Sequence, residues 1–519
     1  MPEVKRALIS VFNKEGVVDF ARGLKDLGIE ILSTGGTAKV LKGAGISVRD
    51  VSEYTGAPPM LEGRVKTLHP KVHAAILALR DKPAQMEEVE KHGVDLIDMV
   101  VVNFYPFLDV IQGKVKVREA LESIDIGGPT MLRAAAKNFP YVAAISSPHQ
   151  YEEVLEELKK NNRFLSEDTC LKLAARAFQE ISAYDSFIAE YLRRQREKGF
   201  PEIINLSFRK KGDLRYGENP HQRGAFYGEW IERGTSLSFA RKLSGKELSF
   251  NNLLDLDAAL RIVREFEEPA AVVIKHTNPC GAGCADSLSE AFKKAYAGDP
   301  LSAFGSVVGL NKTVDVSTAE EMTSEGTFIE GIIAPDYEEE ALEILKNRRK
   351  WGKSVRILKT GPFLPQIDEW DMKRIGGGIV LQEIDRCTYE ANNLKVVTRR
   401  KPTQEEMDDL LFGWIICKHV RSNAIVLTKD KMVVGVGAGQ MSRVDSCFMA
   451  VHKAADRSKG SVLASDAFFP FPDAVEEAGR AGVTAIIQPG GALRDEKVIE
   501  VANRYDIAMV FTGMRHFRH

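Results

Sequence analysis

The sequence lacks long hydrophobic runs and an excess of charge of either sign. No stretch of about 18 uncharged apolar residues occurs, and even residues 96–111 are interrupted by Asp98 and Asp109, so a membrane-spanning helix is not expected. The 71 basic and 73 acidic residues give a formal net charge of −2, so no global field draws the chain to nucleic acid or to a membrane surface. We therefore expect small-molecule partners.

Cysteine is also scarce. Six scattered cysteines in 519 residues are typical of a reducing compartment. The opening Met-Pro-Glu-Val-Lys-Arg precedes only a short apolar stretch and has the character of neither a signal peptide nor a transit peptide. We therefore expect a cytoplasmic protein.

A complete zinc-deaminase signature is missing as well. The segment Pro279-Cys280-Gly-Ala-Gly-Cys284 has one residue too many between its thiols for P-C-x-x-C, and neither H-x-E nor C-x-E occurs in the chain. Without that glutamate and a third ligand, we expect no catalytic metal.

The length and the pattern of apolar residues predict several α/β domains. A chain of 519 residues exceeds one hydrophobic core, and its 44% hydrophobic and 28% charged residues are ordinary for a soluble protein. Up to about residue 195, short apolar strands alternate with helices, which predicts a mostly parallel sheet with ligands beyond the carboxyl ends of its strands. Residues 197–207 contain Gly199 and Pro201 and predict a linker, with a second α/β unit starting near Phe208.

Residues 270–281 carry the strongest indication of chemistry. A buried-type strand, Val272 to Ile274, delivers Lys275 and His276 into a Pro/Gly-rich loop, a usual position for catalytic groups. The charge of Lys275 disfavours the imidazolium form of His276, which would then accept a proton, while Lys275 polarises a carbonyl or holds an anion. For an isolated Lys-His pair, the alternative is a plain strand end with a solvated lysine.

Three segments of the first 200 residues predict anion binding. Residues 34–37 and 125–130 each join a Gly-Gly pair to the start of a helix, where free N–H groups and the helix dipole favour a phosphate, although a plain β–α turn remains an alternative. Residues 63–71 gather three cations, a histidine and a threonine, which suits a phosphate or a developing oxyanion. Asn103 and Tyr105 place an amide and a phenol at a strand end.

Two segments of the second unit are less specific. Residues 215–222 are polar, aromatic and rich in turn formers, which fits a loop that stacks on a heterocycle or an ordinary surface loop. Residues 435–440 follow a strand but lack the G-x-G-x-x-G spacing, because Gln440 and Met441 follow Gly439. A backbone turn is favoured there over a dinucleotide site.

Taken in order along nearly the whole chain, several motifs resemble one family: bifunctional phosphoribosylaminoimidazolecarboxamide (AICAR) formyltransferase and inosine monophosphate (IMP) cyclohydrolase. The resemblance implies an N-terminal methylglyoxal-synthase-like parallel-sheet domain, residues 1–198, and a transformylase region, residues 199–519. That region would comprise two cytidine-deaminase-like α/β subdomains, about 208–370 and 371–519, without zinc chemistry. The matching segments are residues 33–39, 63–70, 124–128, 132–138, 214–222, 275–279, 437–440 and 465–471.

The resemblance also implies a function and partners. The enzyme would transfer a formyl group from the co-substrate 10-formyltetrahydrofolate to the 5-amino group of AICAR, giving FAICAR, and then close FAICAR to IMP. A homodimer with a shared transformylase site is implied too. The rival hypotheses are a zinc nucleoside deaminase, which stoichiometric zinc would support, and a non-catalytic nucleotide sensor, which formylation of AICAR would exclude.

Candidate site residues follow from the resemblance, residue by residue. The cyclohydrolase site would contain the catalytic residues Lys66, Tyr105, Asp125 and Lys137, with Ser10, Lys14, Gly35, Thr37, Arg64, Thr67, Asn103 and Gly127 around the nucleotide. The transformylase site would contain the catalytic pair Lys275 and His276, with Arg215, Tyr216, Asn252, Gly305, Glu330, Asn423, Arg515 and Phe517 around AICAR. Gln440, Ser442, Phe468, Pro470 and Asp473 would lie toward the folate. Two local departures are Glu330, where the family often has Asp, and Phe12-Asn13 in a loop that is more often small or polar.

Overall fold

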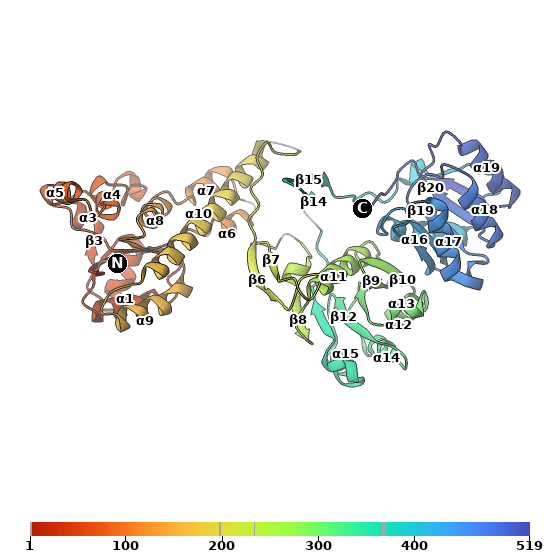
Figure 1. The fold of residues 1–519 in the computed structure, drawn as a ribbon, viewed down its shortest axis with the longest axis horizontal. Helices are drawn as coiled ribbons and strands as arrows, with labels where there is room; N and C mark the ends of the chain where they lie inside the picture. Colours follow the sequence, from red (N-terminus) through yellow and green to blue (C-terminus); the bar gives the residue numbers. More distant parts are fainter. Residues whose placement is uncertain (1–2, 114, 197–198, 233, 366–369) are drawn as a thin grey trace. The chain divides into compact units, whose positions relative to one another are not determined.

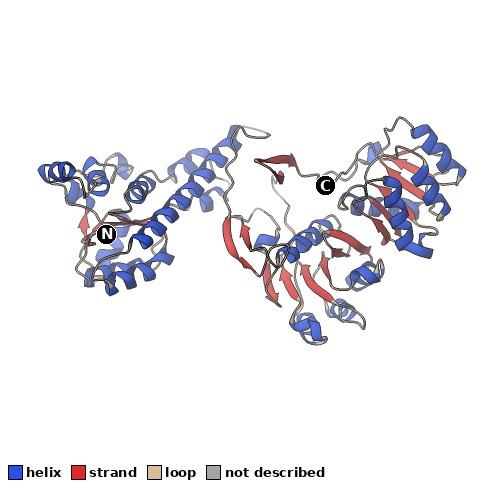
Figure 2. Cartoon of the chain, viewed as in Figure 1, coloured by secondary structure: helices blue, strands red, loops and turns tan. Residues whose placement is uncertain are grey.

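The computed structural model describes residues 3–113, 115–196, 199–232, 234–365 and 370–519 (Figure 1). The chain divides into two compact units, residues 1–207 and residues 208–519. The boundary placed between residues 198 and 199 involves a residue outside the described ranges and stays a prediction. Helices and strands alternate in both units, so the α/β class is confirmed (Figure 2). None of the described helices is both long and apolar enough to cross a membrane.

The first unit is built on a five-stranded parallel sheet, as the alternating pattern predicted. Its order is β3-β2-β1-β4-β5, and every neighbouring pair is parallel. The central strand β1 is buried on both faces, with Ala7 and Ile9 in one core and Leu8 in the other, which explains its unbroken apolar run. The strands are β1 (Arg6–Val11), β2 (Glu30–Ser33), β3 (Arg49–Asp50), β4 (Met99–Asn103) and β5 (Ala143–Ile145).

Helices cover both faces of this sheet. Phe20 of α1 and Leu158 of α9 belong to one core, whereas Leu132 of α8 and Ala177 of α10 belong to the other. Residues 151–196 form two helices with a break between them, where Asn162 and Arg163 have positive φ angles. The helices are α1 (Val17–Asp26), α2 (Gly35–Gly43), α3 (Val51–Thr55), α4 (Pro70–Leu77), α5 (Pro83–Lys91), α6 (Phe107–Ile111), α7 (Val117–Glu122), α8 (Gly127–Lys137), α9 (Tyr151–Lys160) and α10 (Glu167–Arg196).

The second unit contains a twelve-stranded mixed sheet. Its order is β16-β21-β20-β19-β17-β18-β10-β9-β11-β12-β13-β8. Two further hairpins stand apart from it, β6 with β7 (Arg209–Leu214, Gly224–Gly228) and β14 with β15 (Trp370–Ile375, Gly378–Glu383). The sheet strands are β8 (Arg241–Ser244), β9 (Ala270–Lys275), β10 (Asn278–Cys284), β11 (Ser306–Leu310), β12 (Ile329–Ala334), β13 (Arg356–Lys359), β16 (Lys395–Val396), β17 (Ile425–Lys429), β18 (Met432–Gly437), β19 (Val462–Ser465), β20 (Ala485–Gln488) and β21 (Ala508–Phe511).

The two halves of this sheet repeat one arrangement. Each half has a helix, an antiparallel hairpin, a second helix and then three parallel strands, and the halves meet where β10 pairs antiparallel with β18. The division between subdomains near residue 370 stays a prediction, because residues 366–369 lie outside the described part. The helices are α11 (Phe250–Val263), α12 (Leu288–Ala297), α13 (Pro300–Ala303), α14 (Val316–Met322), α15 (Glu339–Asn347), α16 (Gln404–Lys418), α17 (Arg443–Ala454), α18 (Asp473–Arg480) and α19 (Asp495–Arg504).

Glycines in the two central hairpins correct the sequence interpretation. The loop predicted after His276 is a two-residue turn followed by strand β10, and strand β18 continues to Gly437 within residues 435–440, where a turn was predicted. A Cβ atom at Gly281 would overlap the carbonyl oxygen of Ala295 in α12, and one at Gly435 would overlap that of Ala450 in α17. The glycines are therefore needed for a helix to lie directly on each hairpin.

We predict that Gly281→Ala destabilises the second unit by about 1–3 kcal/mol, because the added methyl group forces helix α12 away from the sheet. Gly376→Ala is the matched control, since its Cβ meets nothing within 4 Å and its φ is not positive. Denaturant unfolding of both variants measures the difference. Equal midpoints for the two variants would contradict the packing argument.

Candidate active sites

The carboxyl ends of parallel strands gather the candidate residues of the first unit. Strands β1, β2 and β4 run in the same direction, so the segments that follow Val11, Ser33 and Asn103 lie along one edge of the sheet. Ser10 is half-buried in β1 opposite Val102 of β4. This edge is the usual ligand position of such sheets.

Asn103 shapes the loop between β1 and α1. Its Oδ1 accepts hydrogen bonds from the backbone N–H of Phe12 (2.6 Å) and of Asn13 (2.8 Å), and its Nδ2 donates to the Asn13 carbonyl (3.0 Å). The Phe12 ring packs on Tyr105, with ring centroids 5.0 Å apart. Lys14, in the same loop, donates to the Phe12 carbonyl (3.1 Å), and burial lowers the pKa of Lys14. The Asn103 amide thus holds the loop that carries a candidate phosphate ligand.

An anion cradle lies at the start of α2. The N-cap Thr34 has no side-chain capping bond, which leaves backbone N–H groups free, and Gly35 has a φ of 55°. Thr37 anchors this turn to β1, because its hydroxyl accepts from the Val11 N–H (3.1 Å) and donates to the Val11 carbonyl (2.9 Å). The exposed Lys66 brings its Nζ to 3.5 Å from a Cβ built at Gly35. A cation beside a helix N-terminus suits a phosphate or an oxyanion.

The neighbouring segment reaches the start of α8. The Thr67 hydroxyl lies 2.7 Å from a Cβ built at Gly127, and the Asp125 Oδ1 accepts from the Gly128 N–H (2.9 Å). The Tyr184 hydroxyl accepts from the Asp125 N–H (2.8 Å). Burial raises the pKa of the Asp125 carboxyl, so a larger fraction of this carboxyl is protonated than of an exposed aspartate at the same pH. Lys66, Thr67 and Asp125 therefore share one region between two helix N-termini.

Two candidates of the first unit stand apart from this group. Arg64 is exposed and pairs with Glu122 (2.7 Å). Lys137 is the last residue of α8, about 15 Å along the helix from Gly127 at 1.5 Å per residue, and it lines a surface groove with Leu77 and Phe178. The structure does not bring Lys137 to Asp125, and its catalytic role stays a prediction.

In the second unit the Lys275–His276 pair sits at a tight turn between β9 and β10. His276 and Thr277 both have left-handed φ angles, 52° and 63°, and His276 is exposed. The Lys275 ammonium donates to the carbonyls of Phe304 and Gly305, each at 2.9 Å. The lysine is therefore held in place beside the candidate Gly305, and the alternative of a freely solvated lysine does not apply.

A second group of candidates lies around Glu330 on β12. The Asn252 Nδ2 approaches a Glu330 carboxylate oxygen at 3.5 Å, and the Arg356 Nη1 lies 3.8 Å from the same oxygen. Arg356 is buried, and burial lowers its pKa, with the charge of Arg215 acting in the same direction. Arg215 donates to the Tyr216 hydroxyl (2.8 Å) and stacks over its ring. Sequence reasoning missed Arg356, because a single arginine in a strand carries no motif.

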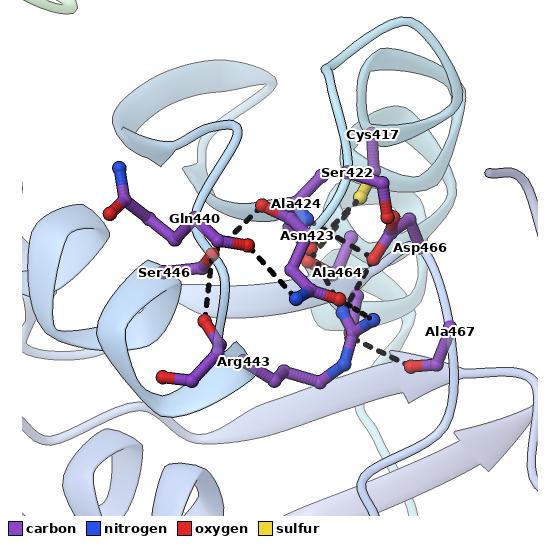
Figure 3. A network of polar contacts seen from close by, with 12 residues as sticks. Cys417, Ser422, Asn423, Ala424, Gln440, Arg443, Ser446, Ala464, Asp466 and Ala467 are labelled. Carbon is purple, nitrogen blue, oxygen red and sulfur yellow. Dashed lines mark hydrogen bonds and ion pairs between the residues drawn. The ribbon is translucent and has the colours of Figure 1, made fainter. Parts of the chain in front are cut away.

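Asn423 is fixed by a buried ion pair (Figure 3). The Arg443 guanidinium donates from Nη1 to Asp466 (2.5 Å) and from Nη2 to the Asn423 Oδ1 (2.8 Å). The Asn423 Nδ2 donates to the carbonyls of Gln440 (2.9 Å) and Met441 (3.2 Å). Arg443 and Asp466 are both buried, so their charges satisfy each other and fix the asparagine amide. Arg443 was not predicted, although it adjoins the candidate Ser442.

The remaining candidates lie on loops near this ion pair. Ser442 caps α17 by accepting the Asp445 N–H (3.1 Å), and the C-terminal tail reaches the network where the His516 N–H donates to the Asp466 carbonyl (2.9 Å). Arg515 stacks over Phe517, with 4.6 Å from the guanidinium carbon to the ring centroid. Phe468, Pro470 and Asp473 are exposed on or just beyond the loop that follows β19.

The near-signature for zinc, Cys280 and Cys284, lies on strand β10. Four residues along a strand separate the two positions by about 13 Å, which is too far for both thiols to bind one metal ion. Burial also raises the pKa of both thiols, that of Cys280 to about 12, so neither is a ready thiolate ligand. The donor set of this segment does not fit a zinc centre.

The fold defines an α/β protein whose first unit gathers two helix N-termini beside Lys66 and whose second unit carries a Lys-His hairpin. Comparison with known families agrees: residues 16–130 match the MGS-like domain, and residues 135–453 match the AICARFT/IMPCHase bienzyme. The chain belongs to the AICARFT/IMPCHase bienzyme family. The resemblance read from the sequence is therefore confirmed, as is the methylglyoxal-synthase-like N-terminal domain.

Several relatives match this chain over their full length and share one name. The bifunctional purine biosynthesis protein PurH of Thermoanaerobacter sp. (strain X514) is 50% identical over 516 residues, which cover 99% of this chain and 100% of that protein. PurH of Rhodopirellula baltica is 51% identical over 518 residues, which cover 99% of both chains. PurH of Anoxybacillus flavithermus is 50% identical over 516 residues, 99% of this chain and 100% of that one. The chain is thus a bifunctional enzyme of purine biosynthesis, an AICAR formyltransferase and an IMP cyclohydrolase.

We predict that Asn103→Ala lowers the free energy of unfolding of the first unit by about 1–3 kcal/mol and impairs cyclisation, because three hydrogen bonds to the β1–α1 loop are lost. Asn103→Asp keeps the two accepted bonds and is the matched control, with a smaller expected loss. Denaturant unfolding and a cyclisation assay measure both effects. An Asn103→Ala enzyme with unchanged stability would contradict the role of this amide.

Proposed function

We propose that each unit catalyses one of the two reactions: the second unit formylates AICAR, and the first closes FAICAR to IMP. The observation that carries this division is the rigid hairpin turn that presents Lys275 and His276, in a unit separate from the anion cradle around Lys66. We further propose 10-formyltetrahydrofolate as the formyl donor, bound near Gln440, Ser442, Phe468, Pro470 and Asp473. A cytoplasmic homodimer with a shared transformylase site completes the proposal.

Formyl transfer needs a base and a cation. The lone pair of the AICAR amine is delocalised into its ring, so the amine attacks the formyl carbon poorly. His276 accepts the amine proton as the new C–N bond forms, and Lys275 stabilises the oxyanion of the tetrahedral intermediate. The intermediate collapses by breaking the bond to the folate nitrogen, which takes up the proton that His276 accepted. The exposed position of His276 at the turn leaves its ring accessible to both substrates.

Ring closure is intramolecular, so orientation does much of the work. The carboxamide nitrogen adds to the formyl carbon, and the Lys66 ammonium beside Gly35 stabilises the resulting oxyanion. The attacking nitrogen loses a proton, and the oxyanion becomes a hydroxyl. The nitrogen that carried the formyl group then loses its hydrogen as the hydroxyl takes up a second proton and leaves as water. Asp125, whose pKa is raised by burial, is suited to deliver this proton, and Tyr105 is a second group that can exchange protons.

We predict that His276→Asn lowers kcat for formyl transfer by about 10²–10⁴-fold, the usual contribution of a general base, while cyclisation of supplied FAICAR continues. Asparagine tolerates the left-handed backbone of this position, so the change removes the imidazole and keeps the turn. Separate assays of AICAR formylation and FAICAR closure measure the two activities. Loss of both activities would count against two separate sites.

We predict that Lys66→Ala lowers kcat for cyclisation by about 10²-fold, because one oxyanion-stabilising cation is removed, and leaves formyl transfer intact. Lys71→Ala is the matched control: it removes a cation from the same segment, where Lys71 lies over the Tyr54 ring. The closure of FAICAR to IMP is followed for both variants. A normal rate in Lys66→Ala would show that this assignment is wrong.

A further inference from the structure

The second unit contains two equivalent left-handed turns. His276 and Thr277, between β9 and β10, have φ angles of 52° and 63°, and Asp430 and Lys431, between β17 and β18, have φ angles of 53° and 51°. Each turn follows a lysine whose ammonium donates to the backbone: Lys275 to two carbonyls, and Lys429 to the carbonyl of Lys459. Non-glycine residues in this conformation cost about 1–3 kcal/mol each and persist only where surrounding groups hold them.

An aspartate from the same helical position binds each turn. Asp255 is the sixth residue after Ser249, the N-cap of α11, and Asp409 is the sixth after Thr403, the N-cap of α16. The Asp255 Oδ1 accepts from the Thr277 N–H at 2.7 Å. The Asp409 carboxylate accepts from the N–H groups of Asp430 (2.8 Å) and Lys431 (2.6 Å). In both halves of the sheet, a carboxylate from a helix therefore holds the turn of a hairpin.

The two copies differ in what the turn presents. The second turn offers Asp430 and Lys431, and Lys431 is paired with Glu268 (2.9 Å). The first turn presents the exposed His276 imidazole. Of the two backbone N–H groups in this turn, Asp255 binds that of Thr277. Burial raises the pKa of Asp255, while the charges of His276 and Lys275 oppose that rise, so this carboxylate lies within electrostatic reach of both groups.

We propose that Asp255 is a positioning residue for formyl transfer. By holding the Thr277 N–H it fixes the left-handed turn, and thereby the direction from which the His276 ring meets the substrate amine. A misplacement of about 1 Å in a reacting group can cost about 10²-fold in rate, so one hydrogen bond at the turn is enough to matter. The inference rests on the proposed role of His276 as the base.

The test compares Asp255→Ala with Asp409→Ala, which removes the equivalent support from the turn without the histidine. Asp255→Ala is expected to lower kcat for formyl transfer at least tenfold with the KM for AICAR changed less than threefold. Asp255→Asn, which keeps an acceptor oxygen, should stay within threefold of the parent. Asp409→Ala should also stay within threefold, although it loses two hydrogen bonds. A KM that rises as much as kcat falls, or equal losses in Asp255→Ala and Asp409→Ala, would overturn the proposal.

A double-mutant cycle separates positioning from general destabilisation. On the His276→Asn background, Asp255→Ala should change kcat less than twofold, because no imidazole remains to be positioned. A further tenfold loss would refute the proposal. If the single variant His276→Asn keeps full formyl-transfer activity, the proposed base is wrong. If His276→Asn loses this activity while Asp255→Ala keeps it, only the inference about Asp255 fails. Should Asp255→Ala not fold, Asp255→Glu, which moves the carboxylate by one methylene, takes its place with the same thresholds.

Discussion

The close approach of a helix to each central hairpin is the constraint on which the second unit depends. Gly281 and Gly283 on β10, and Gly435 and Gly437 on β18, leave no side chain between the hairpin and the carbonyl groups of α12 and α17. The helices can then pack directly on the two strands that join the halves of the twelve-stranded sheet. Because both hairpins are fixed in this way, the turns at their ends hold their side chains in defined positions.

The two units place charge by different means. In the first, backbone N–H groups come from the start of α2, whose N-cap has no side-chain capping bond, and from the start of α8. The exposed Lys66 adds a cation beside Gly35. In the second, charges are immobilised: Lys275 is bound to two carbonyls, and Arg443 is buried against Asp466. An intramolecular closure needs mainly a shaped anion site, whereas transfer between two substrates needs donors and acceptors at fixed positions.

Local patterns in the sequence predicted the parallel sheet of the first unit, the loops at its carboxyl edge and the position of Lys275 and His276. They failed for β10 and for the end of β18, because glycine and proline mark turns in most sequences and here serve helix packing. Asp255, Arg356 and Arg443 could not be found locally, since their partners lie at least 22, 26 and 19 residues away in the chain, respectively. Lys137 illustrates the opposite problem. The motif suggested that it lies in the site, but it is at the C-terminal end of α8, whereas the site is at the N-terminal end.

An ionic contact that includes the buried Lys418 also joins the two halves of the second unit. Glu265, just after α11, accepts from Lys418 (2.9 Å) and contacts His419 (3.1 Å) at the end of α16. Burial opposes its ionised form, but these partners hold the pKa of Glu265 at about 2, while burial lowers the pKa of His419 to about 4. At neutral pH the imidazole is therefore uncharged and Lys418 is the countercharge. The contact between the buried Lys418 and the partly buried Glu265 favours one arrangement of the two helices, because any displacement leaves a charge without its partner.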